Sequence, residues 1–159
     1  MNPMSIKDSI RKYDEIFEGE PWFGNSILKS LEHIPALFWD KKPKKVSHSI
    51  SELVYHLIDW RGFVIEKLKE NRAFDIELNS EKDWRKNVSI QNEKEKKKTL
   101  EELVETQNII CELLLTKPDS WLNELVAGRK YRNGYMINGV IQHDIYHLGQ
   151  INMVYSQLK

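Results

Sequence analysis

The chain has 159 residues, of which 40% are hydrophobic, and its 24 basic side chains balance 24 acidic ones. This length and composition predict one domain, and the neutral charge gives no reason to expect a nucleic acid or an anionic membrane as partner. The single cysteine, Cys111, excludes an intrachain disulfide, and no segment has the apolar run of a signal peptide or a membrane span, so we expect a soluble, cytoplasmic protein.

Apolar residues at steps of three and four predict two helices in the first quarter of the chain. The first spans Ile6–Phe17 and ends at a Gly-Glu-Pro break. The second starts near Trp22 and runs to about Trp39. It should kink or stop early at Pro35, because proline removes a helical hydrogen bond and clashes with the preceding turn.

The rest of the chain alternates long helices with polar connections. Ser49-Ile50-Ser51-Glu52 matches a capping box, so a long helix should follow to about residue 70. Periodicity then fades over residues 71–96, which predicts a long crossover that ends in a solvated lysine-rich loop. Further helices are expected at about 99–116 and 135–157, with an irregular segment at 119–133.

Four long amphipathic helices, no convincing strand and one long crossover predict an all-α fold. The expected architecture is a four-helix bundle, with the crossover between its second and third helices and one domain over residues 1–159. Bundles commonly build metal sites from side chains on facing helices, so candidate ligands are sought on different helices.

Two histidines, His143 and His147, lie one turn apart in the last predicted helix. Residues at i and i+4 have Cβ atoms roughly 5–6 Å apart on one face, so both rings can reach a single ion. Both also fall on the buried stripe of the helix, where an imidazole needs partners for its nitrogens. The pattern favours metal ligands, and the alternative is a pair of core histidines satisfied by hydrogen bonds.

A metal site with an open position usually takes three protein ligands, so a third donor should come from another helix. His56 is the best candidate, since apolar residues flank it at i−3 and i+4 in the helix that follows the capping box. Its alternative role is a boundary histidine bonded to a carboxylate or carbonyl. His48 and His33 lie next to predicted helix ends and are not expected to be ligands.

Other side chains near the histidines could support them. Asp59 lies one turn from His56 and either orients that ring or makes a surface hydrogen bond. Asp144 projects about 100° away from its neighbour His143 around the helix, so direct ligation is not expected. Tyr146 is expected to pack or to donate a hydrogen bond rather than to act as an acid. Three indoles either wall a pocket or belong to the core: Trp22, Trp60 and Trp84.

The segments SELVYHLIDWR (51–61) and GVIQHDIYHLGQI (139–151) resemble the DinB-like superfamily, as do PWFG (21–24) and DW (83–84). The resemblance covers nearly the whole chain. It implies a four-helix bundle with the long crossover, a divalent metal held by His56, His143 and His147, and frequent homodimers. The family is named after DNA-damage-inducible genes, which implies a stress-related role.

Related branches of that superfamily include S-transferases that use low-molecular-weight thiols and proteins described as metal-dependent hydrolases. A three-histidine ion with open positions could act as a Lewis acid, or could lower the pKa of bound water to about 7 or of a bound thiol. Zinc and nickel are the expected ions, with iron and manganese as alternatives. We therefore expect an S-transferase or a hydrolase acting on a small molecule. The alternative is a non-catalytic, stress-related bundle in which the metal clamps helices together.

Overall fold

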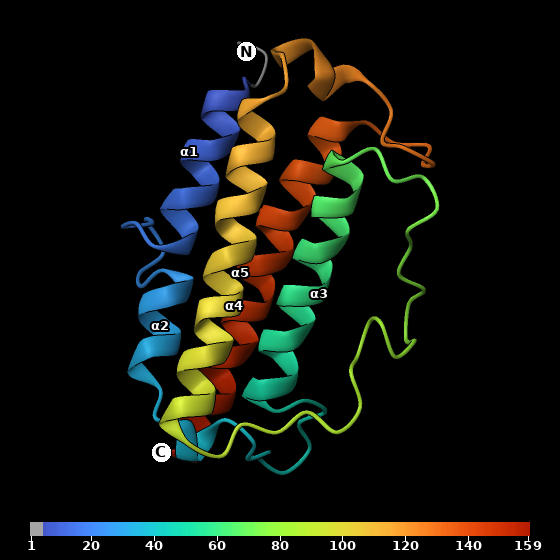
Figure 1. Cartoon of the computed structure of the whole chain (residues 1–159). Coiled ribbons are helices and arrows are strands. Elements are labelled where there is room, and N and C mark those ends of the chain that lie inside the picture. Colours follow the sequence, from blue (N-terminus) through green and yellow to red (C-terminus); the bar gives the residue numbers. More distant parts are fainter. Residues whose placement is uncertain (1–4) are drawn as a thin grey trace.

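The computed structural model describes residues 5–159, and its long elements are all helical (Figure 1). Within these residues, β geometry is confined to an isolated bridge between Leu125 and Arg132. The all-α class predicted from the sequence is therefore confirmed. The α-helices are α1 (Ile6–Phe17), α2 (Ile27–His33), α3 (Ile50–Leu68), α4 (Glu93–Leu115) and α5 (Asn133–Leu158), and the 3-10 helices are η1 (Ala36–Phe38) and η2 (Asp119–Asn123).

Four of the helices, α1, α3, α4 and α5, lie side by side, and α2 continues beyond the end of α1 (Figure 1). Both α1 and α3 pack against α4 and α5. The connection between α3 and α4 runs down the outside of α3 before it joins α4 (Figure 1). None of the helices within residues 5–159 combines the length and the apolar composition needed to cross a lipid bilayer.

The core lies between these helices, and each of them contributes fully buried apolar side chains. Burying one side chain of this size stabilises the fold by roughly 1.5–3 kcal/mol, so the apolar stripes hold the helices together. The buried residues include Tyr13, Phe17, Leu57, Val64, Leu103, Ile110, Ile137, Leu148 and Ile151.

The predicted capping box is present at the start of α3. The Ser49 hydroxyl accepts a hydrogen bond from the N–H of Glu52 at 3.2 Å, and the Glu52 carboxylate accepts one from the N–H of Ser49 at 2.7 Å. These two bonds satisfy backbone donors that have no partner inside the helix. They fix the start of the helix that carries His56.

The second predicted helix is shorter than expected. It begins at Ile27 after the N-cap Ser26, because Gly24, at φ +126°, turns the chain just before it. It ends at His33, and Pro35 instead precedes the short helix η1. Proline therefore stops the helix rather than kinking it.

Helix α4 begins six residues earlier than expected. Asn92 caps it by accepting a hydrogen bond from the N–H of Glu95 at 3.0 Å, so the lysine-rich segment is helical rather than a solvated loop. Lys96 shows why a run of lysines does not by itself predict a solvated loop. Its stem is buried and its Nζ donates to the carbonyl of Glu32 at 2.9 Å, so a charged residue supplies a packed contact.

Candidate metal centre

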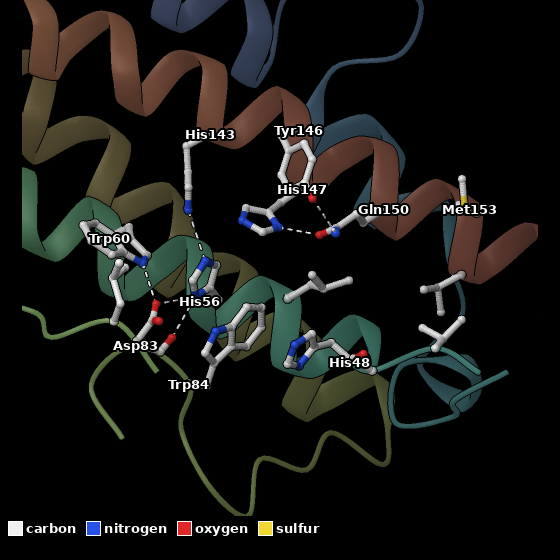
Figure 2. Close-up of a pocket in the computed structure, with 15 residues that line it drawn as sticks. His48, His56, Trp60, Asp83, Trp84, His143, Tyr146, His147, Gln150 and Met153 are labelled. Atoms are coloured by element: carbon white, nitrogen blue, oxygen red, sulfur yellow. Dashed lines mark hydrogen bonds and ion pairs between the residues drawn. The ribbon is translucent and has the colours of Figure 1, made fainter. Parts of the chain in front are cut away.

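Three histidines from two helices meet at one point beside a cavity (Figure 2). His56 comes from α3, and His143 and His147 come from α5. One ring nitrogen of each lies within 4.8 Å of those of the other two, and the Nε2 atoms of His56 and His143 are 3.1 Å apart. Two nitrogens that share a tetrahedral zinc ion, each at about 2.0–2.1 Å, are separated by about 3.3 Å. The spacing therefore fits a common ion.

Hydrogen bonds on the far side of two rings set which nitrogen faces the cluster. Nδ1 of His56 donates to the main-chain carbonyl of Asp83 at 2.7 Å, and Nδ1 of His147 donates to Oε1 of Gln150 at 2.6 Å (Figure 2). A carbonyl oxygen only accepts, so each Nδ1 carries the proton and each Nε2 presents a lone pair. His56 thus combines its two predicted roles: it is bonded to a carbonyl through Nδ1, and its Nε2 lone pair, which contacts Nε2 of His143 at 3.1 Å, points into the cluster.

Burial keeps these imidazoles neutral. The side chains of His56 and His147 are 5% and 6% exposed. Loss of hydration lowers the pKa of His147 to about 4, with a further contribution from neighbouring His143, and burial also lowers the pKa of His56. The neutral form is the one that ligates metals, so the rings are already in a binding state near neutral pH.

The connection between α3 and α4 supplies an aromatic support for His56. Trp84 stacks on the His56 ring with centroids 3.9 Å apart and planes 6° from parallel. His48 stacks on the same indole, with centroids 3.6 Å apart, so Trp84 lies between two imidazoles (Figure 2). The structure agrees that His48 is no member of the three-histidine cluster, but it shows this ring lining the cavity rather than lying in solvent at a helix entrance.

Asp83 ties the same connection to α3. Its carboxylate accepts a hydrogen bond from the Trp60 indole at 2.9 Å and another from the N–H of Asn79 at 2.7 Å. Its Oδ1 also lies 3.3 Å from Nδ1 of His56. The sequence analysis did not identify Asp83 as the partner of His56. The available signal was the Asp83-Trp84 pair in an otherwise aperiodic crossover.

Asp59 does not take the role considered for it. Its carboxylate binds Arg85, with the shortest distance 2.6 Å, rather than the ring of His56. Helix direction explains the difference, because Asp59 points to the outside of α3 toward the connection. The surface alternative is the correct one.

Two further expectations concern α5. Asp144 is no member of the three-histidine cluster, as expected, and its Oδ2 pairs with Arg61 at 2.8 Å in the interior. Tyr146 is largely exposed, and its hydroxyl accepts a hydrogen bond from Nε2 of Gln150 at 3.3 Å (Figure 2). Tyr146 therefore orients the amide that holds His147, and it lines the cavity.

The three tryptophans considered as pocket walls occupy different environments. Trp60 and Trp84 line the cavity, whereas Trp22 is 99% exposed and lies outside it, so the pocket-wall role considered for Trp22 is wrong. Cys111 is half-buried away from the cluster, and burial together with the nearby Asp14 carboxylate raises the pKa of its thiol to about 12. It is therefore a protonated thiol and no nucleophile at neutral pH.

The cavity beside the histidines has a volume of about 750 Å³, which is large enough for a small organic molecule. Its walls are mostly apolar and aromatic, and no lysine or arginine occurs among the lining residues that the structure describes. Besides the three histidines, the lining consists of Val46, Ser47, His48, Leu53, Trp60, Leu78, Asp83, Trp84, Tyr146, Gln150, Met153 and Val154.

Comparison with protein families matches the chain to the model of the DinB superfamily over residues 24–151. This span includes all three histidines of the cluster and the Asp83-Trp84 pair. Comparison with curated proteins and with solved structures finds no match.

Proposed function

Because the chain belongs to the DinB superfamily, we propose that it is a metal-dependent enzyme that binds one divalent ion through His56, His143 and His147. We infer further that α1, α3, α4 and α5 form the DinB-like four-helix bundle, with the long crossover between α3 and α4 as its connection between second and third helices. Zinc or nickel is the proposed ion, since imidazole suits both.

The observation that carries this proposal is that two buried imidazoles, His56 and His147, and the half-buried imidazole of His143 meet on the wall of a cavity of about 750 Å³. A purely structural site is closed by four protein ligands, whereas three ligands beside a cavity leave room for a substrate. When bound, such an ion polarises a substrate and lowers the pKa of a water or thiol, which supplies a nucleophile at neutral pH.

The surrounding residues orient the three histidines and determine which substrates the cavity can hold. Asp83 and Gln150 fix the Nδ1–H tautomers of His56 and His147, so both Nε2 lone pairs are held in place before binding. The lining is mostly apolar and aromatic, and among the described residues it includes no lysine or arginine that could recognise an anion. We therefore propose a small and largely uncharged substrate.

Thiol-dependent S-transfer is the reaction that the site supports best. Both carboxylate oxygens of Asp83 already accept a hydrogen bond, and this stabilises the carboxylate and makes it a weaker general base. Transfer of a thiol to an electrophile needs little base catalysis once the thiol is ionised. Hydrolysis is the second candidate, and His48 favours it because this imidazole lines the same cavity and could accept a proton from water.

A homodimer with a stress-related role stays a prediction from the family resemblance, and a cytoplasmic location stays a prediction from the sequence composition. Gel filtration with light scattering at several protein concentrations tests the dimer.

Metal analysis of the purified protein tests the proposed site. We expect about one equivalent of zinc or nickel in the wild type and loss of most of it in His56→Ala, His143→Ala and His147→Ala. His33→Ala is the matched control, because His33 is exposed at the end of α2 and should leave the metal content unchanged. Full metal content in His143→Ala would contradict the site.

Turnover of a model electrophile, with and without a low-molecular-weight thiol, separates the two reactions. S-transfer predicts consumption of the electrophile that requires the thiol and is lost in His143→Ala. Thiol-independent cleavage of ester or amide substrates, reduced in His48→Gln, would support hydrolysis instead. Chelation that unfolds the protein, with neither activity, would support the non-catalytic bundle.

A further inference from the structure

Two buried polar atoms next to the histidine cluster have no hydrogen-bond partner among residues 5–159. They are Nδ1 of His143 and Oδ1 of Asp144, and they lie 3.8 Å apart. Unpaired buried polar atoms are costly, and two complementary ones side by side call for an explanation. His143 is also the one cluster histidine whose Nδ1 has no partner, since Asp83 and Gln150 hold the other two.

The way Arg61 binds Asp144 leaves the second carboxylate oxygen free. Arg61 and Asp144 are both fully buried, and Nε and Nη2 of Arg61 donate to the same oxygen, Oδ2, at 3.1 and 2.8 Å. An arginine usually binds a carboxylate through both oxygens. Here Oδ2 takes both bonds, and Oδ1 is left facing His143.

The arginine itself cannot move to reach Oδ1 easily. Its Nη1 donates to Thr106 and Gln107, at 3.4 and 3.3 Å, and its guanidinium lies over the rings of Tyr13 and Phe17. The carboxylate is therefore anchored at one oxygen by a rigid cation. The other oxygen needs to move by only about 1 Å to reach the normal N–H···O distance from Nδ1 of His143.

We propose that Asp144 is the positioning residue of His143: its Oδ1 accepts a hydrogen bond from Nδ1–H and thereby holds the Nε2 lone pair of His143 toward the metal. Each of the three ligands then has its own acceptor, a carbonyl for His56, an amide for His147 and a carboxylate for His143. The carboxylate is the strongest acceptor of the three and raises the basicity of its ring most. This inference rests on the proposed metal site.

Asp144→Asn makes a sharp test, because an amide cannot satisfy both neighbours in the same way. Arg61 requires an acceptor, so the amide oxygen must face Arg61 and the NH₂ group must face His143. The NH₂ group donates to Nδ1 and stabilises the tautomer with its proton on Nε2. That proton occupies the nitrogen that the metal needs.

The experiment measures zinc affinity by competition with a chelator, and the His143 tautomer by ¹⁵N NMR of the metal-free and zinc-loaded full-length protein. We expect zinc to bind about 10–100-fold more weakly to Asp144→Asn than to the wild type. We also expect the zinc-loaded wild type to show a hydrogen-bonded Nδ1–H on His143, and this signal to be lost in the variant. Thr106→Val is the matched control, since it removes another partner of Arg61 without touching His143, and its zinc affinity should not change.

The outcomes separate this inference from the metal site itself. A wild type that binds no zinc overturns the proposed function. A wild type that binds zinc, with a folded Asp144→Asn variant of equal affinity, overturns the role of Asp144 alone. If the variant does not fold, the wild-type spectrum decides: zinc-loaded His143 must show a protonated, hydrogen-bonded Nδ1, and coordination through Nδ1 contradicts the inference.

Discussion

Helices α3 and α5 build two polar clusters that differ in charge and in access. In the interior, Arg61 and Asp144 form an ion pair with both side chains 0% exposed. At the cavity, three histidine rings from the same two helices meet, and no carboxylate among residues 5–159 joins the group. The charges of Arg61 and Asp144 compensate each other, whereas the histidine cluster presents nitrogen lone pairs that can still accept a cation. We call the buried ion pair the closed cluster and the three histidines at the cavity the open cluster. The closed cluster serves the fold, and the open cluster can be entered by a cation.

Removal of one partner from the closed cluster should have the largest effect on stability. We expect Arg61→Leu to lower the free energy of unfolding by about 3–5 kcal/mol, because it leaves the Asp144 carboxylate buried without a counter-charge. Urea denaturation of the metal-free protein measures this loss. The double variant Arg61→Leu/Asp144→Leu should recover much of the lost stability. A loss under about 1 kcal/mol in Arg61→Leu would show that this ion pair contributes no more than a solvent-exposed salt bridge.

Addition of a cation to the open cluster should have the next largest effect. Zinc at about 100 times its Kd is expected to stabilise the wild type by about 2.7 kcal/mol, because it binds the folded state only. The melting temperature with and without zinc measures this gain. His143→Ala should show no gain, while His33→Ala should match the wild type. Equal stabilisation of all three proteins would locate the ion elsewhere.

Acid should weaken the open cluster. Burial lowers the pKa of His147 to about 4, below its ordinary value of 6.5, so the unfolded chain binds the proton more readily. The stability from this neutral ring is complete above pH 6.5 and is lost as the pH falls through 6.5 toward 4. Denaturation of the metal-free protein at pH 7, 5 and 4 tests this. His147→Gln should flatten the profile over this range, and an unchanged slope would refute the assignment.

Asp59→Asn should have the smallest effect. This carboxylate, like Asp144, pairs with an arginine close to a cluster histidine, but its partner Arg85 is partly exposed and it does not contact His56. We expect zinc affinity within about twofold of the wild type, because only residues that hydrogen-bond a ligand change metal affinity strongly. A tenfold loss would assign to Asp59 the orienting role that we give to Asp83 and Asp144.

Local sequence patterns predicted a helix boundary correctly where the signal depends only on residues close together in the chain. The capping box at Ser49 and Glu52 forms as expected, because it needs only residues three apart. The boundary of α4 was missed because propensity and charge say little about whether a lysine stem such as that of Lys96 packs on another helix. Trp22 was misjudged for the converse reason, since an aromatic residue before a turn need not meet any partner.

The sequence by itself determined the all-α class, the family and the identity of the three clustered histidines. The i, i+4 spacing of His143 and His147 and the apolar stripe around His56 are periodic features, which survive in any fold that pairs these helices. Tertiary structure alone decided what holds those rings. Asp83 reaches His56 across 27 residues, and Arg61 reaches Asp144 across 83. Such contacts depend on where the crossover and the facing helix come to lie, and no local spacing encodes that position.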